Sequence, residues 1–309
     1  MMWDKKGLIC SHETLNLPWY KKNTMVPIPY LMNENCLRIF VTMCDEQNIG
    51  RIGYIDVDPQ NPSNIISHSK NPVVNIGDDG NFDDNGVVTA SLLKHDNKLY
   101  LYYSGYQSCV KVPYLIFTGL AVSDDNGNTF TKISNRVPIL DRISGESGTR
   151  CVPFVIHEHG KFKMWYTADS GNGWIDGEKK KLPLYDLKYL ESNSPIEWPR
   201  APGKLAVEFK DSDEHGIAKC TLWKEDGIYK IIYSIRSLSK QYRLGYGESN
   251  DGINFTRKDD QVGLDVSESG WDSEMVAFAE RIVVKDKTYL FYCGNHYGMA
   301  GIGYAVLKQ

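Results

Sequence analysis

The chain has no long hydrophobic run. No stretch of its 309 residues approaches the 18 apolar residues that indicate a membrane-spanning helix. The opening residues, MMWDKKGLIC, contain neither the apolar region nor the cleavage site of a secretory signal peptide. Cysteine is scarce, with seven residues and no CxxC spacing, which disfavours a disulfide framework and a metal site. We therefore expect a cytoplasmic protein with buried free thiols and no membrane span.

Several functional signatures are also absent. The formal net charge is −4, which gives no reason to expect nucleic acid as a partner. No HExxH, P-loop, GxSxG or strand-borne GxGxxG motif is present. The segment DDGNFDDNG resembles a calcium loop in composition, but it lacks the ligand spacing and the terminal Glu. We expect no metal and no cofactor, and the sequence gives no indication of an oligomeric state.

Aromatic residues are abundant, with 19 Tyr and 7 Trp, and they mark an internal repeat. Five strand-like segments share a short turn followed by alternating aromatic and aliphatic residues. If their equivalent positions are aligned, the spacings are 62, 63, 67 and 60 residues, a regular period. The positions aligned in this way are Leu37, Leu99, Phe162, Tyr229 and Tyr289.

Each repeat carries further strands, and almost no segment has the pattern of a helix. Three or four strands per unit, repeated five times, predict an all-β protein that is a single five-bladed β-propeller domain. The blades are expected at about residues 20–70, 80–140, 145–205, 212–262 and 270–309, with N-terminal residues closing the last blade. A linear solenoid is the alternative, but units of about 60 residues without capping repeats argue against it.

Acidic residues recur where each innermost strand begins, at the point where the blades of a propeller converge. The alignment places Asn23, Asp84, Ser147, Glu214 and Glu274 at one position. Asp and Asn are also ordinary turn residues, so a structural role stays open. Converging carboxylates repel one another and burial disfavours their charged forms, which favours a functional role. Because glycosidic cleavage needs two carboxyl groups, we predict Asp84, Glu214 and Glu274 as catalytic residues.

Seven further residues are predicted to bind the substrate. A basic side chain can hold a carboxylate or phosphate, a histidine can bind a sugar hydroxyl or move a proton, and a tryptophan can stack on a sugar ring. Each has a structural alternative, since a lone histidine often only packs and a tryptophan can simply fix its own loop. The predicted set is Asp83, Arg150, His215, Lys219, Trp174, Asp272 and His296.

Several motifs resemble a known family. GNFDDNGV, YLYYSGYQ, GLAVSDDNGNTF, YRLGYGESNDGINF and DVSESGWDSEMV are similar to a family of five-bladed-propeller, glycosyl-hydrolase-like bacterial proteins. Its genes often lie among those for surface polysaccharide synthesis. A similar domain occurs at the N-terminus of plant glucosamine inositolphosphorylceramide transferases. The resemblance spans about Pro27 to Leu307. It implies functional roles for Asp83, Asp84, Glu214, Asp272 and Glu274.

A more distant resemblance is to the superfamily of arabinanases, β-xylosidases, invertases and levansucrases. Those enzymes place an Asp in blade one, an Asp in blade two and a Glu in blade three. Here the position in blade one is Asn23, and the acids lie mainly in blades two, four and five. The resemblance therefore implies the fold more strongly than a particular hydrolase activity.

Together these features predict a carbohydrate-active, glycoside-hydrolase-like enzyme that cleaves or transfers a glycosidic or sugar-phosphate bond. Glu274 or Glu214 would be the general acid and Asp84 the base or nucleophile, with a sugar, sugar nucleotide or glycan as substrate. The alternative is a non-catalytic glycan-binding propeller, or an accessory protein of surface polysaccharide biosynthesis. Two carboxyl groups about 5–10 Å apart across a pocket would favour the enzyme, whereas acids used in structural hydrogen bonds would favour the binding protein.

Overall fold

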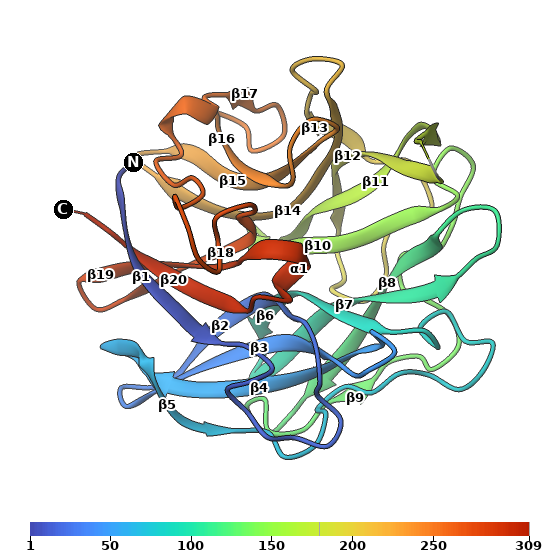
Figure 1. The fold of residues 1–309 in the computed structure, drawn as a ribbon. Coiled ribbons are helices and arrows are strands. Elements are labelled where there is room, and N and C mark those ends of the chain that lie inside the picture. The colour runs from blue at the N-terminus through green and yellow to red at the C-terminus, as the bar shows by residue number, and fades with distance from the viewer. Residues whose placement is uncertain (179, 309) are drawn as a thin grey trace.

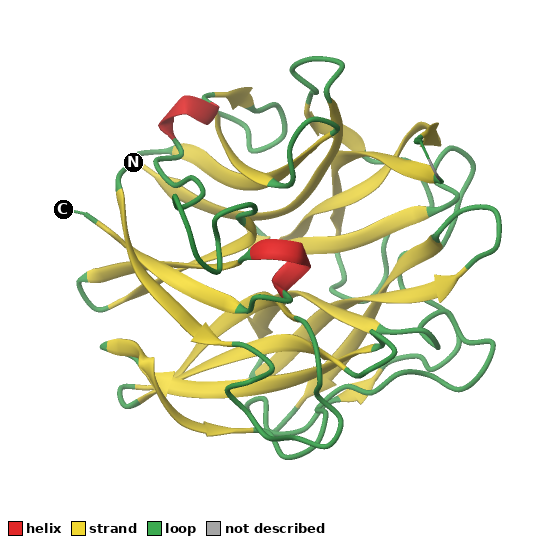
Figure 2. Ribbon diagram, in the orientation of Figure 1, coloured by secondary structure: helices red, strands yellow, loops and turns green. Residues whose placement is uncertain are grey.

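The computed structural model describes residues 1–178 and 180–308. This part of the chain is almost entirely β-structure (Figure 2). Its two helical segments are short, namely the 3₁₀ turn η1 (Asp259–Gln261) and α1 (Asn295–Gly298). None of its helices has the length and apolar character needed to cross a membrane. The prediction of an all-β protein is confirmed.

The strands fall into five successive antiparallel groups, within which each strand pairs with its neighbour. Short parallel pairings join the second, third and fourth groups, so the hydrogen bonds define three sheets. The first is β2 (Thr24–Asn33), β3 (Cys36–Cys44), β4 (Gly50–Asp58) and β5 (Asn61–His68). The second is β6 (Val87–His95), β7 (Lys98–Ser108), β8 (Tyr114–Ser123) and β9 (Thr131–Lys132). The third is β10 (Thr149–Glu158), β11 (Lys161–Asp176), β12 (Lys181–Ser192) and β13 (Lys204–Val207).

The fourth group is β14 (Glu214–Glu225), β15 (Ile228–Ser237), β16 (Arg243–Ser249) and β17 (Thr256–Arg257). The fifth contains β18 (Ala277–Val284), β19 (Lys287–Cys293) and β20 (Ile302–Leu307). Its outer strand is β1 (Trp3–Cys10), which pairs antiparallel with β20 from Trp3 opposite Leu307 to Cys10 opposite Ile302. The two ends of the chain therefore share one sheet, and they lie close together in Figure 1.

The first strands of the five groups surround a common centre. β6 packs against β2 and β10, β14 packs against β10 and β18, and β18 packs against β2, so the contacts close into a ring. In Figure 1 these strands lie toward the middle of the view, and the later strands of each group lie farther out. The starts of the first strands consequently face a shared space.

Each first strand contains a β-bulge, where its register with the second strand shifts. A bulge adds an unpaired residue and redirects the strand. The bulge gives positive φ angles to residues for which this conformation is costly, including Val26 (53°), Val152 (39°) and Phe278 (54°). The freed backbone N–H groups donate to side chains of the neighbouring group: Val26 N to Cys293 Sγ (3.0 Å), Thr89 N to Thr42 Oγ1 (2.9 Å), Val152 N to Ser104 Oγ (2.9 Å) and Phe278 N to Ser234 Oγ (2.8 Å).

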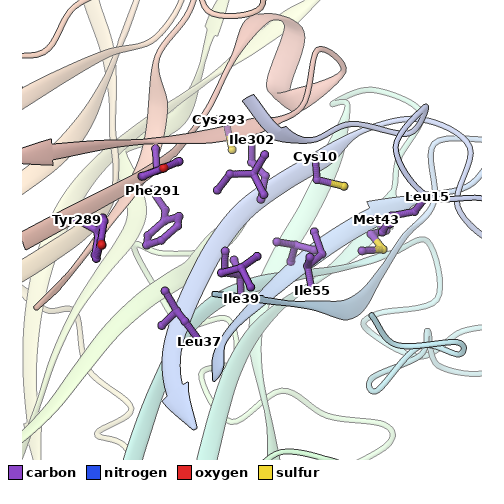
Figure 3. Packing of buried hydrophobic residues seen from close by; sticks show 14 of the residues in the cluster. Cys10, Leu15, Leu37, Ile39, Met43, Ile55, Tyr289, Phe291, Cys293 and Ile302 are labelled. Carbon is purple, nitrogen blue, oxygen red and sulfur yellow. The ribbon is translucent and has the colours of Figure 1, made fainter. Parts of the chain in front are cut away.

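The hydrophobic core lies between adjacent groups. Between the fifth and first groups, Leu37, Ile39 and Ile55 pack in one buried cluster with residues of β19 and β20 such as Phe291 and Ile302 (Figure 3). All five of these side chains are fully excluded from solvent. Because this cluster joins segments from opposite ends of the sequence, burial of apolar surface stabilises the closed ring.

Lys219, predicted to hold substrate, instead forms an ion pair with Glu280 inside the protein. Its ammonium group donates to Cys220 O (2.9 Å) and to Glu280, whose other oxygen accepts from Thr221 Oγ1 (3.0 Å). Burial raises the pKa of Glu280, and the nearby Lys219 opposes this effect. The pair joins β14 to β18, so the two charged residues that interrupt otherwise apolar strands have a structural explanation.

This pair gives a test by double-mutant cycle. Lys219→Met alone leaves Glu280 buried without its partner, and should lower the free energy of unfolding by about 3–5 kcal/mol. Glu280→Leu alone should have a similar effect. The double variant Lys219→Met/Glu280→Leu removes both charges and should unfold in urea close to the wild type. A double variant as unstable as the sum of the single variants would contradict this assignment.

Candidate functional site

A cavity of about 1060 Å³ opens where the first strands begin and the second strands end. Residues of the first four groups, Met275 just before β18, and the segment around α1 line it, and none of its described lining residues is Asp or Glu. The lining combines four tyrosines with five basic residues. These are Tyr106, Tyr114, Tyr242 and Tyr297, with Lys22, His215, Arg236, Lys240 and His296.

A smaller cavity of about 400 Å³ continues from the large one. The two share Tyr106, Tyr114 and Arg236 among other residues, so Arg236 borders both. The inner cavity also reaches Thr149 of β10 and Thr167 of β11. Both threonines are buried, and neither hydroxyl has a hydrogen-bond partner in the described structure.

The tyrosines form two connected clusters on the cavity wall. The ring of Tyr114 lies 5.3 Å from that of Tyr106 and 5.8 Å from that of Trp174, in edge-to-face arrangements. The ring of Tyr242 lies 5.9 Å from that of Tyr297, also edge to face. Burial raises the pKa of Tyr106, Tyr114 and Tyr242, so their hydroxyls stay protonated and can donate hydrogen bonds at neutral pH.

Two of the ten predicted site residues line the large cavity, His215 and His296. His215 Nδ1 lies 2.8 Å from Pro183 O, so this nitrogen carries the proton and Nε2 is the acceptor of the neutral ring. Burial lowers the pKa of His215, and this effect exceeds the opposing hydrogen bond to Pro183. A neutral imidazole on a cavity wall can accept a hydrogen bond from a ligand hydroxyl.

The predicted catalytic residue Glu274 lies beside the cavity rim. Its side chain is 52% exposed, and one carboxylate oxygen lies 3.5 Å from His296 Nε2. Gln241 Nε2 donates to the same oxygen at 3.2 Å. Glu274 is therefore the one predicted catalytic acid in direct contact with cavity-lining side chains among the described residues.

The predicted catalytic residue Glu214 is engaged elsewhere. Both of its oxygens accept hydrogen bonds from the guanidinium of Arg257 in β17, at 2.6 and 2.7 Å, and one also accepts from Lys210 N at 2.8 Å. Asp84 Oδ2 accepts from Gly80 N at 2.9 Å, which is a turn contact. Neither acid lines the cavity, so the structure does not bring Asp84, Glu214 and Glu274 together on its wall.

Buried acids form one recurring arrangement with a tyrosine of the second strand and a cation. Asp83 accepts from Tyr103 Oη (3.0 Å) and Lys132 Nζ (2.6 Å). Asp272 accepts from Tyr292 Oη (3.0 Å) and from Lys5 Nζ (2.7 Å) of β1. Asp83 and Asp272, both predicted to bind substrate, therefore also have structural roles, although Asp83 Oδ1 is buried without a hydrogen-bond partner in the described structure.

The third group repeats this arrangement. Glu146 accepts from Tyr166 Oη (2.8 Å) and Lys188 Nζ (3.1 Å), and it forms an ion pair with Arg150 Nε at 2.7 Å. Arg150 is 1% exposed, and it also donates to backbone carbonyls of Asp141 and Ala201. Arg150, predicted to hold a substrate anion, is thus occupied within its own sheet.

The predicted loop around Trp174 is a β-hairpin. β11 continues through Trp174 to Asp176, and Trp174 pairs with Pro183 of β12. Lys179 within this segment lies outside the described residues. Trp174 does not line the cavity itself, but its ring supports Tyr114, which does.

The hydrogen bonds also correct the alignment of the fifth repeat by one residue. The hydroxyls of Tyr103, Tyr166 and Tyr292 each donate to a buried acid in the same way. Ser104 follows Tyr103 and Cys293 follows Tyr292, and both accept a hydrogen bond from a backbone N–H of the bulge in the next group. This equivalence makes Thr288, and not Tyr289, the counterpart of Leu37. The acid of the fifth group that corresponds to Asp83 and Glu146 is therefore Asp272.

The sequence-based predictions missed Arg236 and most of the tyrosines that line the cavity. Arg236 follows Tyr233 by three residues, as Tyr106 follows Tyr103, and both lie near the end of a second strand. The shared offset was available in the sequence as a signal that these side chains face the same space. Among the described residues, no cluster of three or more His, Cys, Asp or Glu side chains is placed to hold a metal ion.

The chain was compared with known proteins by sequence and by structure. No family model matches this chain. Two uncharacterised proteins of Mycobacterium tuberculosis, from strains CDC 1551 and H37Rv, are each 27% identical over 309 residues, with full coverage of both chains. These two relatives match the chain over its whole length.

Solved structures of glycoside hydrolases are similar to the chain throughout. One glycoside hydrolase has a TM-score of 0.74 at 16% identity, covering 98% of this chain and 90% of its own. A thermostable family-43 glycoside hydrolase has a TM-score of 0.67 at 15% identity, with 94% and 89% coverage. A GH130 structure, from a family of mannoside phosphorylases that contains β-1,2-mannoside hydrolases, has a TM-score of 0.71 at 15% identity, with 99% and 93% coverage. The chain has a glycoside-hydrolase-like propeller fold.

The contrast between Glu214 and Glu274 gives a stability test. Glu214→Gln removes a buried charge that accepts two hydrogen bonds from Arg257, and should lower the free energy of unfolding by about 1.5–3 kcal/mol. Glu274→Gln, at a half-exposed side chain, should change it by less than about 0.5 kcal/mol. Urea unfolding of both variants measures the difference. Equal stabilities would show that the Glu214–Arg257 pair has no structural importance.

Proposed function

We propose that the chain is a five-bladed β-propeller that binds a carbohydrate in its central cavity. Each group of strands would be one blade, and β1 would close the fifth blade. The observation that carries the proposal is the contrast between the acids and the cavity lining. The acids Asp83, Glu146, Glu214 and Asp272 pair with cations outside the cavity, whereas the lining offers tyrosines and basic side chains.

The chemistry of the lining suits a sugar. Tyrosine rings present flat apolar faces against which a sugar ring can pack, while their hydroxyls supply hydrogen bonds. The neutral His215 adds an acceptor at Nε2. A cavity of about 1060 Å³ lies at the upper end of the range for sites that enclose a small organic ligand. The similarity to glycoside hydrolases supports a glycan or glycan precursor as the ligand class.

Removal of one tyrosine ring tests the binding proposal. Tyr114→Ala deletes a ring of the cavity wall, and should weaken the binding of carbohydrates found by glycan-array screening by roughly 2- to 10-fold. The control is Tyr30→Ala, at a half-buried tyrosine that does not line the cavity. Isothermal titration calorimetry measures both affinities. Equal losses in the two variants, or no loss in either, would contradict binding in this cavity.

A second candidate function is enzymatic, and the contact between Glu274 and His296 at the cavity rim favours it. In this reading Glu274 is the general acid and His215 the acceptor of a proton. A positioned acid contributes roughly 10²–10⁴-fold to the rate.

Turnover of aryl glycosides and sugar nucleotides separates the two functions. The binding proposal expects no release of product by the wild-type protein, and the same result for Glu274→Gln. Turnover by the wild type that falls roughly 10²–10⁴-fold in Glu274→Gln would instead establish the enzymatic function. Wild-type turnover that survives in Glu274→Gln would exclude both the pure binding function and a catalytic Glu274. If the wild-type protein shows no turnover, the binding proposal still requires that it bind a carbohydrate.

A further inference from the structure

Arg236 is a half-buried cation without an acidic partner in the described part of the chain. Its Nη2 donates to Tyr297 Oη at 2.9 Å, and its guanidinium carbon lies 5.7 and 5.9 Å from the ring centres of Tyr242 and Tyr297. Burial raises the pKa of Tyr185, and a hydrogen bond with Arg236 opposes this effect. By contrast, Arg38, Arg150 and Arg257 each hold a carboxylate at 2.6–2.7 Å. A guanidinium has five N–H donors, so Arg236 keeps donors for a ligand beyond its contacts with Tyr185 and Tyr297.

The residues at the position equivalent to Arg236 in two other groups accept hydrogen bonds from the backbone. Asp169 and Asn295 also follow the second-strand tyrosine by three residues. Asp169 Oδ2 accepts from the N–H groups of Ser147 and Gly148, both at 2.7 Å. Asn295 Oδ1 accepts from Glu274 N and Met275 N, at 2.8 and 3.0 Å. Arginine cannot accept a hydrogen bond, so at this position it cannot cap the backbone in the same way.

The surroundings of Arg236 favour an anion. Lys22 and Lys240 line the same cavity, and so do His215 and His296, while the lining lacks described acids. Two carboxylates lie close to the cavity lining: Glu274 contacts His296, and Asp213 accepts from Ser239 N and Oγ at 2.9 and 2.6 Å. A guanidinium matches the oxygen spacing of phosphate and can bind it through two parallel hydrogen bonds. A phosphate ester carries nearly two negative charges at neutral pH, which suits several cations better than a single carboxylate does.

The inner cavity supplies hydroxyl groups next to this cation. Thr149 and Thr167 are 2% and 1% exposed, and their hydroxyls have no partner in the described structure. A buried hydroxyl left unpaired costs free energy, so a ligand that satisfies it gains affinity. Sugar hydroxyls can both donate to and accept from threonine. Arg236 borders both cavities, so a phosphate bound there could leave its sugar among the threonines.

The geometry points to a phosphorylated carbohydrate as the ligand, with its phosphate bound by Arg236 and its sugar hydroxyls bound by Thr149 and Thr167. This inference rests on the proposed carbohydrate-binding function and specifies its substrate class. It assigns the unpaired guanidinium and the two unpaired hydroxyls to one molecule. The basic residues of the outer cavity then face the solvent side of the phosphate, where a second phosphate or a nucleotide can extend.

The test compares ligands that differ only in the anion. Calorimetric titration of the wild-type protein uses neutral hexoses, the corresponding hexose 1-phosphates, sugar nucleotides, hexuronates and pyrophosphate. The phosphorylated sugars should bind more tightly than the neutral sugars, with an affinity that falls as salt is added. Equal affinity for neutral and phosphorylated sugars would overturn the role of the phosphate and leave carbohydrate binding intact. If hexuronates bind as tightly as the phosphorylated sugars, the site recognises a carboxylate and the inferred phosphate specificity is wrong.

Variants then assign the contacts. Arg236→Gln should weaken the binding of hexose 1-phosphate roughly 10- to 100-fold, and Arg236→Lys should weaken it less. Arg281→Gln is the matched control, because Arg281 is also half-buried and unpaired but lies outside both cavities, against the ring of Trp223. Near-wild-type thermal unfolding of the Arg236 variants shows that any loss is local. Unchanged affinity in Arg236→Gln would overturn the inference.

The threonines separate this inference from the proposed function. Thr149→Val and Thr167→Val should weaken the binding of hexose 1-phosphate but leave the binding of pyrophosphate unchanged, because pyrophosphate has no sugar. If pyrophosphate binds through Arg236 while every sugar fails to bind, the carbohydrate function fails and only an anion site remains. If the valine variants weaken neither ligand, the assignment of the sugar to the inner cavity is wrong.

Discussion

Charge balance within each sheet decides what the cavity presents to a ligand. Asp83 and Asp272 each lie within 2.7 Å of a lysine on an outer strand of the same sheet, and Glu214 is held by both terminal nitrogens of Arg257. A buried carboxylate without such a partner would be strongly destabilising. Because the acids are neutralised in this way, they tie outer strands to the loops that lead into the inner strands. The central cavity is left with cations and tyrosines.

The same backbone framework supports both the structural and the proposed binding roles. The bulge in each first strand opens the sheet, and in β2, β6, β10 and β18 a free N–H of the bulge donates to a hydroxyl or thiol of the adjoining group. These contacts link neighbouring groups close to the space between the strand starts. Side chains three residues beyond the second-strand tyrosine then lie close to that space. Asp169 and Asn295 cap backbone there, whereas Arg236 and Tyr106 border the cavity.

The repeat was predictable because it depends on local sequence. Alternating side chains and turn residues recur at nearly constant spacing, and these features identify strands without knowledge of their partners. The site was less predictable because its partners are remote in the chain. Lys132 is 49 residues from Asp83, and Lys5 is 267 residues from Asp272. Nothing local to those acids shows that a cation neutralises them, so a recurring acid resembles an active site until the tertiary contacts are known.

A one-residue error in the alignment of the fifth repeat changed which of its residues was matched to the acids of the other repeats. A shift of one position changes which side chains are taken as equivalent across the five repeats. With Thr288 aligned, Ser273 takes the position of Asp84 and Glu214, and Asp272, which is buried against Lys5, takes the position of Asp83 and Glu146. Glu274, which is half exposed at the rim, then has no acidic counterpart in the other repeats. The aromatic residue that decides the register is Tyr292, and its hydroxyl contact with Asp272 identifies it.

The distribution of charge also bears on how a ligand would reach the cavity. The chain as a whole carries a formal charge of −4, yet Lys22, Arg236 and Lys240 border its large central opening. A cleft lined by one sign of charge, with walls of low polarity, concentrates the field and attracts ligands of opposite charge. The acids would cancel this field if they faced the opening. Their pairing with cations inside the sheets therefore leaves the cavity lining without a described acid, which is the arrangement that the proposed anion site needs.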